Sequence, residues 1–163
     1  MNWLLAMTGA AALAALLPMT HSATARGGFA SERPWAPEHI ERLPPDIRKA
    51  VLRQARACGS KAAAAHYFSV SIESDGTEFV SLHFEDFACA NRTAICNGAG
   101  CLHQVYLKSA SHHRLVFATY ADDVKLTNDG PRVGLEVSRR GVVQQFQWNG
   151  KRFAVANTKE VWK

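Results

Sequence analysis

The chain has 163 residues, of which 47% are hydrophobic and 20% are charged, and its formal net charge is +5. This balance excludes a disordered chain, and the length suits one domain that buries a real core. The positive charge is compatible with an anionic partner. We favour the alternative that it only keeps the protein soluble.

Residues 1–25 have the pattern of a secretory signal peptide. They contain no charged side chain, carry an apolar run from Trp3 to Leu17 and end in the small-residue pattern Ala23-Thr24-Ala25. We therefore predict cleavage after Ala25 and a periplasmic or secreted protein. An uncleaved membrane anchor is the alternative, but the apolar run is shorter than the roughly 20 residues of a span. No later segment is apolar enough to cross a membrane.

Residues 26–36 mix glycine, serine, proline and charge, and we expect them to form a flexible lead-in to a single domain over residues 37–163. The stretch LPPDIRKAVLRQARACG predicts an amphipathic helix. Prolines stand at its entry, apolar side chains recur at helical spacing, and Gly59 suits a left-handed cap. A second short helix is expected over residues 62–65.

Beyond His66 the apolar pattern changes to a period of two, which is typical of half-buried strands. Asp75-Gly76 and Asn149-Gly150 are strong hairpin turns. A bulge is expected after Asp86, and residues 124–126 are expected to continue the fourth strand. The predicted strands cover residues 68–72, 80–84, 102–107, 114–120, 133–137, 142–148 and 153–155.

No helix-length segment separates successive strands, so the sheet should be largely antiparallel. The predicted fold class is α+β, with an N-terminal amphipathic helix packed on one face of a meander sheet and disulfides that hold the two together. Nothing in the sequence divides this domain in two.

The stretch CANRTAICNGAGC contains three of the four cysteines. In an exported protein an even number of cysteines favours disulfides, and the absence of a CxxC pair weighs against zinc or thioredoxin-like chemistry. One pairing joins Cys89 to Cys101 and Cys58 to Cys96. The other joins Cys96 to Cys101 and Cys58 to Cys89, and the sequence does not choose between them. A metal site with His103 as fourth ligand is a weaker alternative.

The stretches LPPDIRKAVLRQARACG, HYF, CLHQVY and QWNGKRFAV resemble those of small exported bacterial proteins with no assigned activity. This resemblance implies secretion and a helix-plus-sheet layout. It transfers no catalytic residue.

Histidines on or beside the predicted strands are the remaining candidates for chemistry. His83 and Glu85 are two residues apart, so in a strand their side chains share a face, roughly 7 Å apart. His103 follows on the partner strand and Arg114 on the next. Such a group suits cleavage of a phosphodiester without metal, through proton transfer and an arginine that stabilises the developing charge. We favour the alternative that His83 and Glu85 form ordinary cross-strand polar pairs.

His112 and His113 are adjacent in a predicted turn between strands. Neutral imidazole is a common ligand of copper and zinc, so this pair is a candidate surface metal site. Two neighbouring histidines in a polar turn are more often solvent-exposed without a ligand, and we favour that interpretation.

The sequence lacks the GxSxG, GxxxxGK[ST], GxGxxG and HExxH signatures, and we expect no cofactor. Our prediction is an exported, non-enzymatic protein that binds a macromolecular partner of the cell envelope. The first alternative is a small ribonuclease-like phosphodiester hydrolase, the only hypothesis with nucleic acid as a partner. The second alternative is a periplasmic metal-binding protein.

Overall fold

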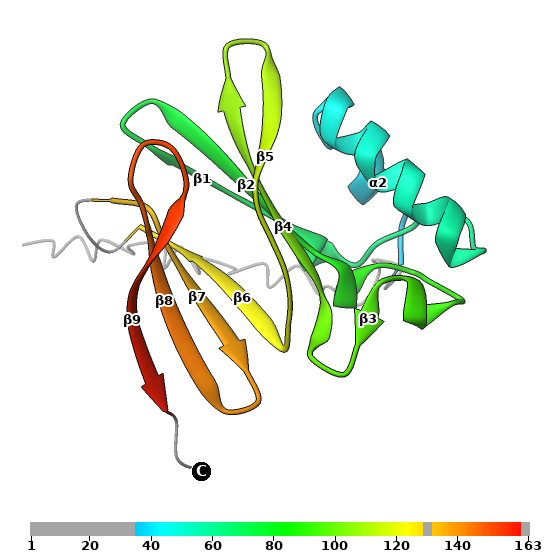
Figure 1. Cartoon of the computed structure of the whole chain (residues 1–163). Helices are drawn as coiled ribbons and strands as arrows, with labels where there is room; N and C mark the ends of the chain where they lie inside the picture. Colours follow the sequence, from blue (N-terminus) through cyan, green and yellow to red (C-terminus); the bar gives the residue numbers. More distant parts are fainter. Residues whose placement is uncertain (1–34, 129–131, 161–163) are drawn as a thin grey trace, which may run out of the picture. The chain divides into compact units, whose positions relative to one another are not determined.

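The chain divides into two units, Met1–Ser31 and Glu32–Lys163. The computed structural model describes residues 35–128 and 132–160, all within the second unit (Figure 1). The predicted signal peptide and almost all of the predicted lead-in lie outside the described residues.

Within the described residues, two α-helices precede the sheets. Helix α1 (Glu38–Glu41) is a single turn, and α2 (Pro45–Cys58) follows it. Proline suits the first position of α2 because no backbone donor is needed there, and Gly59 ends the helix with φ 66°. The buried side chains of α2 recur at helical spacing: Ile47, Val51, Ala55 and Cys58.

Four long strands and one short strand form the first sheet. Strands β1 (Ser69–Ser74) and β2 (Thr77–His83) make a hairpin, in which Asp75 and Gly76 have φ of 50° and 69°, as a tight hairpin turn requires. Strand β4 (Gly100–Ser109) pairs with β2 on one edge and with β5 (His112–Ala121) on the other, and the short β3 (Cys96–Asn97) pairs with the start of β4. All pairs are antiparallel.

The second sheet contains the last four strands in chain order, again antiparallel. The prediction of one meander, with residues 124–126 continuing the fourth strand, was wrong on this point. The chain bends at Asp122, whose backbone N–H donates to Ser138 and whose carboxylate accepts from the Arg140 N–H. This polar corner lets the chain leave one sheet and begin the other. The strands are β6 (Asp123–Thr127), β7 (Gly134–Arg139), β8 (Val142–Trp148) and β9 (Phe153–Glu160).

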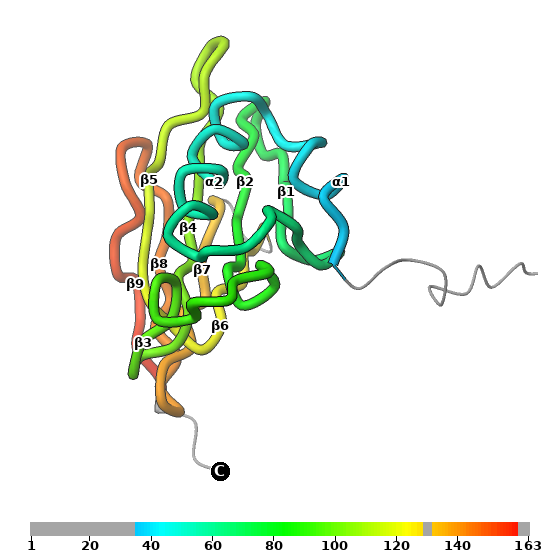
Figure 2. The backbone as a smooth tube through the Cα atoms, turned by 90° about the vertical axis from the view of Figure 1, so that its right-hand side faces the viewer, coloured from blue at the N-terminus to red at the C-terminus, as the bar shows by residue number. Residues whose placement is uncertain are grey.

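The two faces of the first sheet are both covered, because alternate side chains of β2 and β4 point to opposite faces. One face packs against the helices, and Figures 1 and 2 show α2 on the side away from the second sheet. The other face packs against the second sheet, in a core that joins Phe79, Val105 and Leu107 to side chains of β6, β7 and β9. The largest side chains buried on the helix side are Phe68, Phe84, Phe87, Ile47, Leu82 and Ile95.

Three short 3-10 helices connect these elements: η2 (His66–Phe68), η3 (Phe84–Asp86) and η4 (Arg92–Ala94). Two local predictions were wrong here. Residues 62–65 are extended rather than helical, because buried Ala64 forms bridges with Ala36 and Phe87. The irregularity after Asp86 is not a bulge in a continuing strand, because η3 ends β2.

The disulfides are Cys58–Cys89 and Cys96–Cys101, which is the second of the two pairings considered, and their presence confirms the predicted disulfide bonding. The first joins the end of α2 to the segment after η3, and the second joins β3 to β4. Two disulfides indicate an oxidising compartment outside the cytoplasm. Within residues 35–128 and 132–160, no helix combines the length and hydropathy that a membrane span needs.

Candidate functional site

Two histidines lie side by side on the face of the first sheet that turns toward the second sheet. His83 ends β2, and the register of the ladder places it directly opposite His103 of β4. Both lie on the strand face that also carries the core residues Phe79 and Val105, so both are carried inward: His103 is fully buried and His83 is 8% exposed. The sequence-based expectation that these residues meet if the strands pair in register is met by this geometry.

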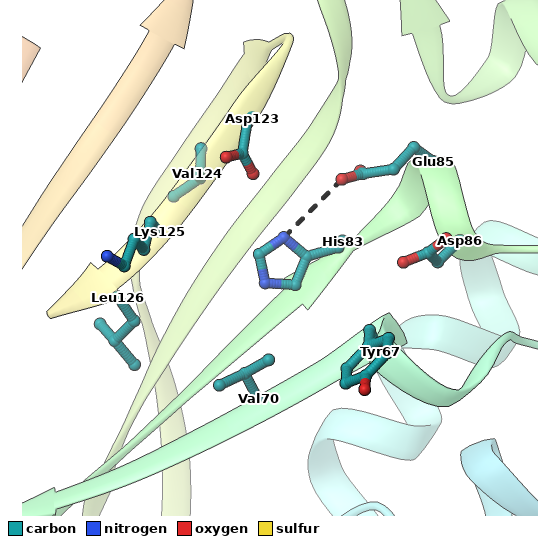
Figure 3. A pocket seen from close by; sticks show the side chains of 9 residues that line it. All are labelled: Tyr67, Val70, His83, Glu85, Asp86, Asp123, Val124, Lys125 and Leu126. Carbon is teal, nitrogen blue, oxygen red and sulfur yellow. Dashed lines mark ion pairs between the residues drawn. The ribbon is translucent and has the colours of Figure 1, made fainter. Parts of the chain in front are cut away.

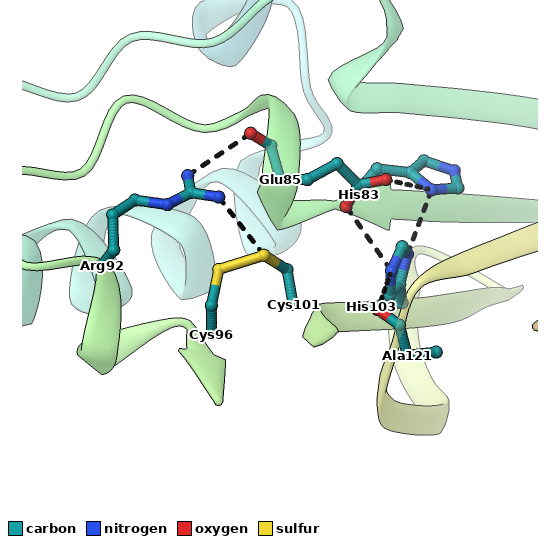
Figure 4. A network of polar contacts seen from close by, with 7 residues as sticks. All are labelled: His83, Glu85, Arg92, Cys96, Cys101, His103 and Ala121. Carbon is teal, nitrogen blue, oxygen red and sulfur yellow. Dashed lines mark hydrogen bonds and ion pairs between the residues drawn. A yellow bond between two sulfur atoms is a disulfide. The ribbon is translucent and has the colours of Figure 1, made fainter. Parts of the chain in front are cut away.

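Glu85 was expected to lie on a strand beside His83. It instead approaches the two histidines from η3. Because the chain turns after His83, the Glu85 carboxylate comes back toward both imidazoles (Figure 4). Oε1 lies 3.9 Å from Nδ1 of His83, and Oε2 lies 3.5 Å from Nε2 of His103. Oε2 is buried and accepts no hydrogen bond from the residues that the structure describes. One ligand atom from each of the three side chains lies within 4.8 Å of the other two.

The proton positions on the imidazoles follow from their neighbours. Nε2 of His103 lies 3.3 Å from the backbone oxygen of Ala121, and it carries the proton because a carbonyl oxygen only accepts hydrogen bonds. Nδ1 of neutral His103 is therefore an unprotonated lone pair, and it faces Nδ1 of His83 at 3.2 Å. The lone pair can accept a hydrogen bond from His83 or bind a metal ion.

Burial sets the charge state of this group. Desolvation, together with the neighbouring His83, lowers the pKa of His103 to about 4. Desolvation also lowers the pKa of His83, although the charges of Asp123 and Asp86 oppose this. Burial raises the pKa of Glu85 to about 7. Two neutral imidazoles therefore meet a carboxyl group that ionises near neutral pH.

A pocket of about 370 Å³ opens beside His83 and Glu85 (Figure 3). Asp123 and Glu85 lie on one side of the His83 imidazole, and Val70 and Tyr67 lie on the other. The second sheet supplies one wall through β6, so the corner at Asp122 is what brings Asp123 to the site. The lining residues are Tyr67, Val70, His83, Glu85, Asp86, Asp123, Val124, Lys125 and Leu126.

Arg114, the arginine expected at this site, lies elsewhere. It pairs with Leu107, whereas His103 pairs with Thr119, so four positions of β4 separate Arg114 from the histidine. The arginine beside Glu85 is Arg92, which donates to the backbone oxygens of Glu85 and Phe87 and to Sγ of Cys101 (Figure 4).

The charged residues around the histidines that were not predicted include Arg92, Asp86, Asp123 and Lys125. Asp86 directly follows Glu85, so its proximity could have been read from the sequence. Asp123 comes from another sheet and Arg92 from the cysteine loop, and no local pattern identifies either.

The second predicted group, His112 and His113, does not form a shared metal site. Both belong to β5 and not to a turn, so successive side chains point to opposite faces. His112 is exposed. His113 is packed toward α2, where its backbone N–H donates to Asp46 and its Nδ1 lies 3.2 Å from Oδ1 of the same carboxylate.

No family model, curated protein or solved structure matches the chain.

Proposed function

We propose that the protein is an exported, non-enzymatic binding protein whose ligand is a divalent transition-metal ion held by His83, His103 and Glu85. The observation that carries the proposal is the contact between the two Nδ1 atoms at 3.2 Å, with a carboxylate beside both rings. Two ligands about 2.0–2.1 Å from a tetrahedral ion are separated by about 3.3 Å. The imidazoles are therefore spaced as ligands of one ion would be.

The surroundings of His103 support this role. A ligating histidine usually donates its second ring N–H to a carbonyl or carboxylate, which fixes the tautomer and the ring orientation. Ala121 provides that carbonyl for Nε2 of His103. Both imidazoles are kept neutral by burial, so they need lose no proton to bind an ion. A cation would also give the buried Oε2 of Glu85 the partner that it lacks within the described residues.

The electrostatics of the pocket favour a cation over a phosphodiester. Glu85, Asp86 and Asp123 line it, against one cation, Lys125. A polyanionic substrate would be repelled here, and among the described residues no arginine lines the pocket to stabilise a developing phosphate charge. The ribonuclease-like hypothesis is thus less well supported than metal binding, although the same histidines would serve both.

The donor set suggests which ions fit. Imidazole with carboxylate suits zinc and the neighbouring divalent transition metals, and does not suit calcium or magnesium, which prefer oxygen ligands. The two disulfides are consistent with a protein that binds its ion in the periplasm or the medium.

The test is calorimetric titration of the oxidised protein with zinc chloride. We expect one ion per chain, and an affinity at least about 100-fold weaker in His83→Gln and in Glu85→Gln, because each removes a ligand. The matched control is His112→Gln, an exposed histidine of the same protein, which should bind within about twofold of wild type. Circular dichroism and a free-thiol assay establish that each variant is folded and oxidised. Absence of stoichiometric uptake by the wild-type protein would refute the proposal.

A further inference from the structure

The three protein donors do not fill the coordination sphere of an ion. A structural zinc site is closed by four protein ligands, whereas three ligands leave at least one position open. Asp86 and Asp123 line the same pocket, but neither belongs to the group of donors that could hold one ion among the described residues.

The open position faces the pocket. His103 is fully buried beneath the site and its far ring nitrogen is bonded to Ala121, so that side is closed. His83 and Glu85 line the pocket, and Glu85 keeps 35% of its side chain exposed. The volume of about 370 Å³ lies in the range of small-molecule sites and far exceeds what one water molecule needs.

The wall opposite the carboxylates is apolar. Tyr67 and Val70 are 68% and 37% exposed, so two of the large hydrophobic residues left open to solvent line this one pocket. Val124 and Leu126 continue the apolar wall from β6. Grouped exposed apolar side chains around a polar centre are typical of a ligand site.

Lys125 adds a positive charge between these two residues of β6. It is exposed and has no hydrogen-bond or ion-pair partner within the described part of the chain. A divalent ion together with Lys125 would balance the charges of the three carboxylates, so an anionic ligand would no longer be repelled.

We propose that the metal-loaded pocket binds a small organic acid with a chelating anionic group at one end and an apolar body at the other. The anionic group completes the coordination of the ion held by His83, His103 and Glu85. The apolar body lies against Val70, Tyr67 and Leu126. This inference rests on the proposed function and names the class of its second ligand.

The test uses the full oxidised protein loaded with one equivalent of Co²⁺, whose visible absorption reports its coordination. Two probes share a chelating head: acetohydroxamate and benzohydroxamate, of which only the second carries a ring. We expect both to change the Co²⁺ spectrum, and benzohydroxamate to bind about tenfold more tightly, since the ring is buried on the apolar wall. Val70→Ser should remove this preference, while Val155→Ser, which changes an exposed valine of β9 outside the pocket lining, should keep it.

The outcomes are separable. If Co²⁺ binds but neither hydroxamate changes its spectrum, the second ligand is refuted and the metal proposal stands. Equal affinity for the two probes, or removal of Co²⁺ by the probe after gel filtration, also overturns the inference. If the protein takes up no Co²⁺, the inference fails together with the proposed function.

Discussion

The first sheet carries two groups of histidine and carboxylate side chains, one at each end of the paired strands β2 and β4. The first is the group of His83, His103 and Glu85. The second contains His113 and Asp46 together with Glu78, which lies 3.9 Å from Nε2 of His113. Both groups consist of histidine and carboxylate side chains, so their composition does not distinguish them.

They differ in whether the chain supplies partners for their carboxylates, although the buried Nε2 of His113 also makes no hydrogen bond among the described residues. Asp46 accepts from the His113 backbone and sits beside its Nδ1, and Glu78 pairs with Lys108 at 3.1 Å. At the other end, two imidazole nitrogens face each other and the buried Oε2 of Glu85 accepts no hydrogen bond. Buried polar groups in native proteins normally have partners, so the group whose carboxylate oxygen lacks one is where an external ligand is expected.

The prediction with the largest expected effect on stability removes Asp46, a carboxylate that has hydrogen-bond partners. Asp46→Ala should lower the free energy of unfolding by about 1–3 kcal/mol, because it leaves the His113 donors unpaired between α2 and β5. Lys49→Ala, an exposed change on the same helix, should stay within about 0.5 kcal/mol. Urea denaturation of the metal-free proteins measures both. An Asp46 variant as stable as the control would contradict a structural role for this group.

A second test concerns Glu85 and pH. Burial raises its pKa from 4.5 to about 7 in the folded protein, so its contribution to stability is fully present below about pH 4.5 and is lost as the pH rises through about 7. Glu85→Gln, which cannot ionise, should lack this loss, and its advantage over wild type should grow between about pH 5 and about pH 8. His103 acts in the opposite direction: its pKa of about 4 destabilises the fold as the pH falls below about 6.5.

The measurement for Glu85 is urea unfolding of wild type and variant across that pH window, with a chelator present. Parallel curves for the two proteins would show that the carboxyl group is not held in a desolvated environment, and the contrast between the two groups would disappear.

The smallest expected effect comes from Lys108, whose side chain is 51% exposed. Lys108→Ala should cost no more than about 1 kcal/mol, and less at high salt, because a solvated ion pair contributes little. Thermal unfolding at low and high ionic strength checks this. A larger, salt-independent loss would mean that Glu78 depends on Lys108 more than its exposure implies.

Much of the strand layout could be predicted from the sequence, because alternation and turn chemistry are local. The Asp75-Gly76 and Asn149-Gly150 turns both lie between paired strands. The meeting of His83 with His103 was expected on the condition that their strands pair in register, and the ladder meets that condition.

The rest depended on long-range packing. Arg114 was placed wrongly because the register of β4 and β5, which includes a shift after Val105, could not be predicted. The meeting of Asp46 with His113 spans 67 residues. The division into two sheets depends on a corner at Asp122, and that corner alone delivers Asp123 to the pocket.

Gly100, the first residue of β4, connects the packing of the cysteine hairpin to the orientation of His103 in the proposed metal site. Its φ is 110°, and a Cβ at this position would overlap the carbonyl of Ala121. That same carbonyl accepts the N–H of His103. A methyl group at Gly100 would thus displace the carbonyl oxygen of Ala121. This would change the orientation of the His103 imidazole without a direct contact. The absence of a side chain at Gly100 therefore helps to hold the His103 imidazole in the orientation that the proposed metal site needs.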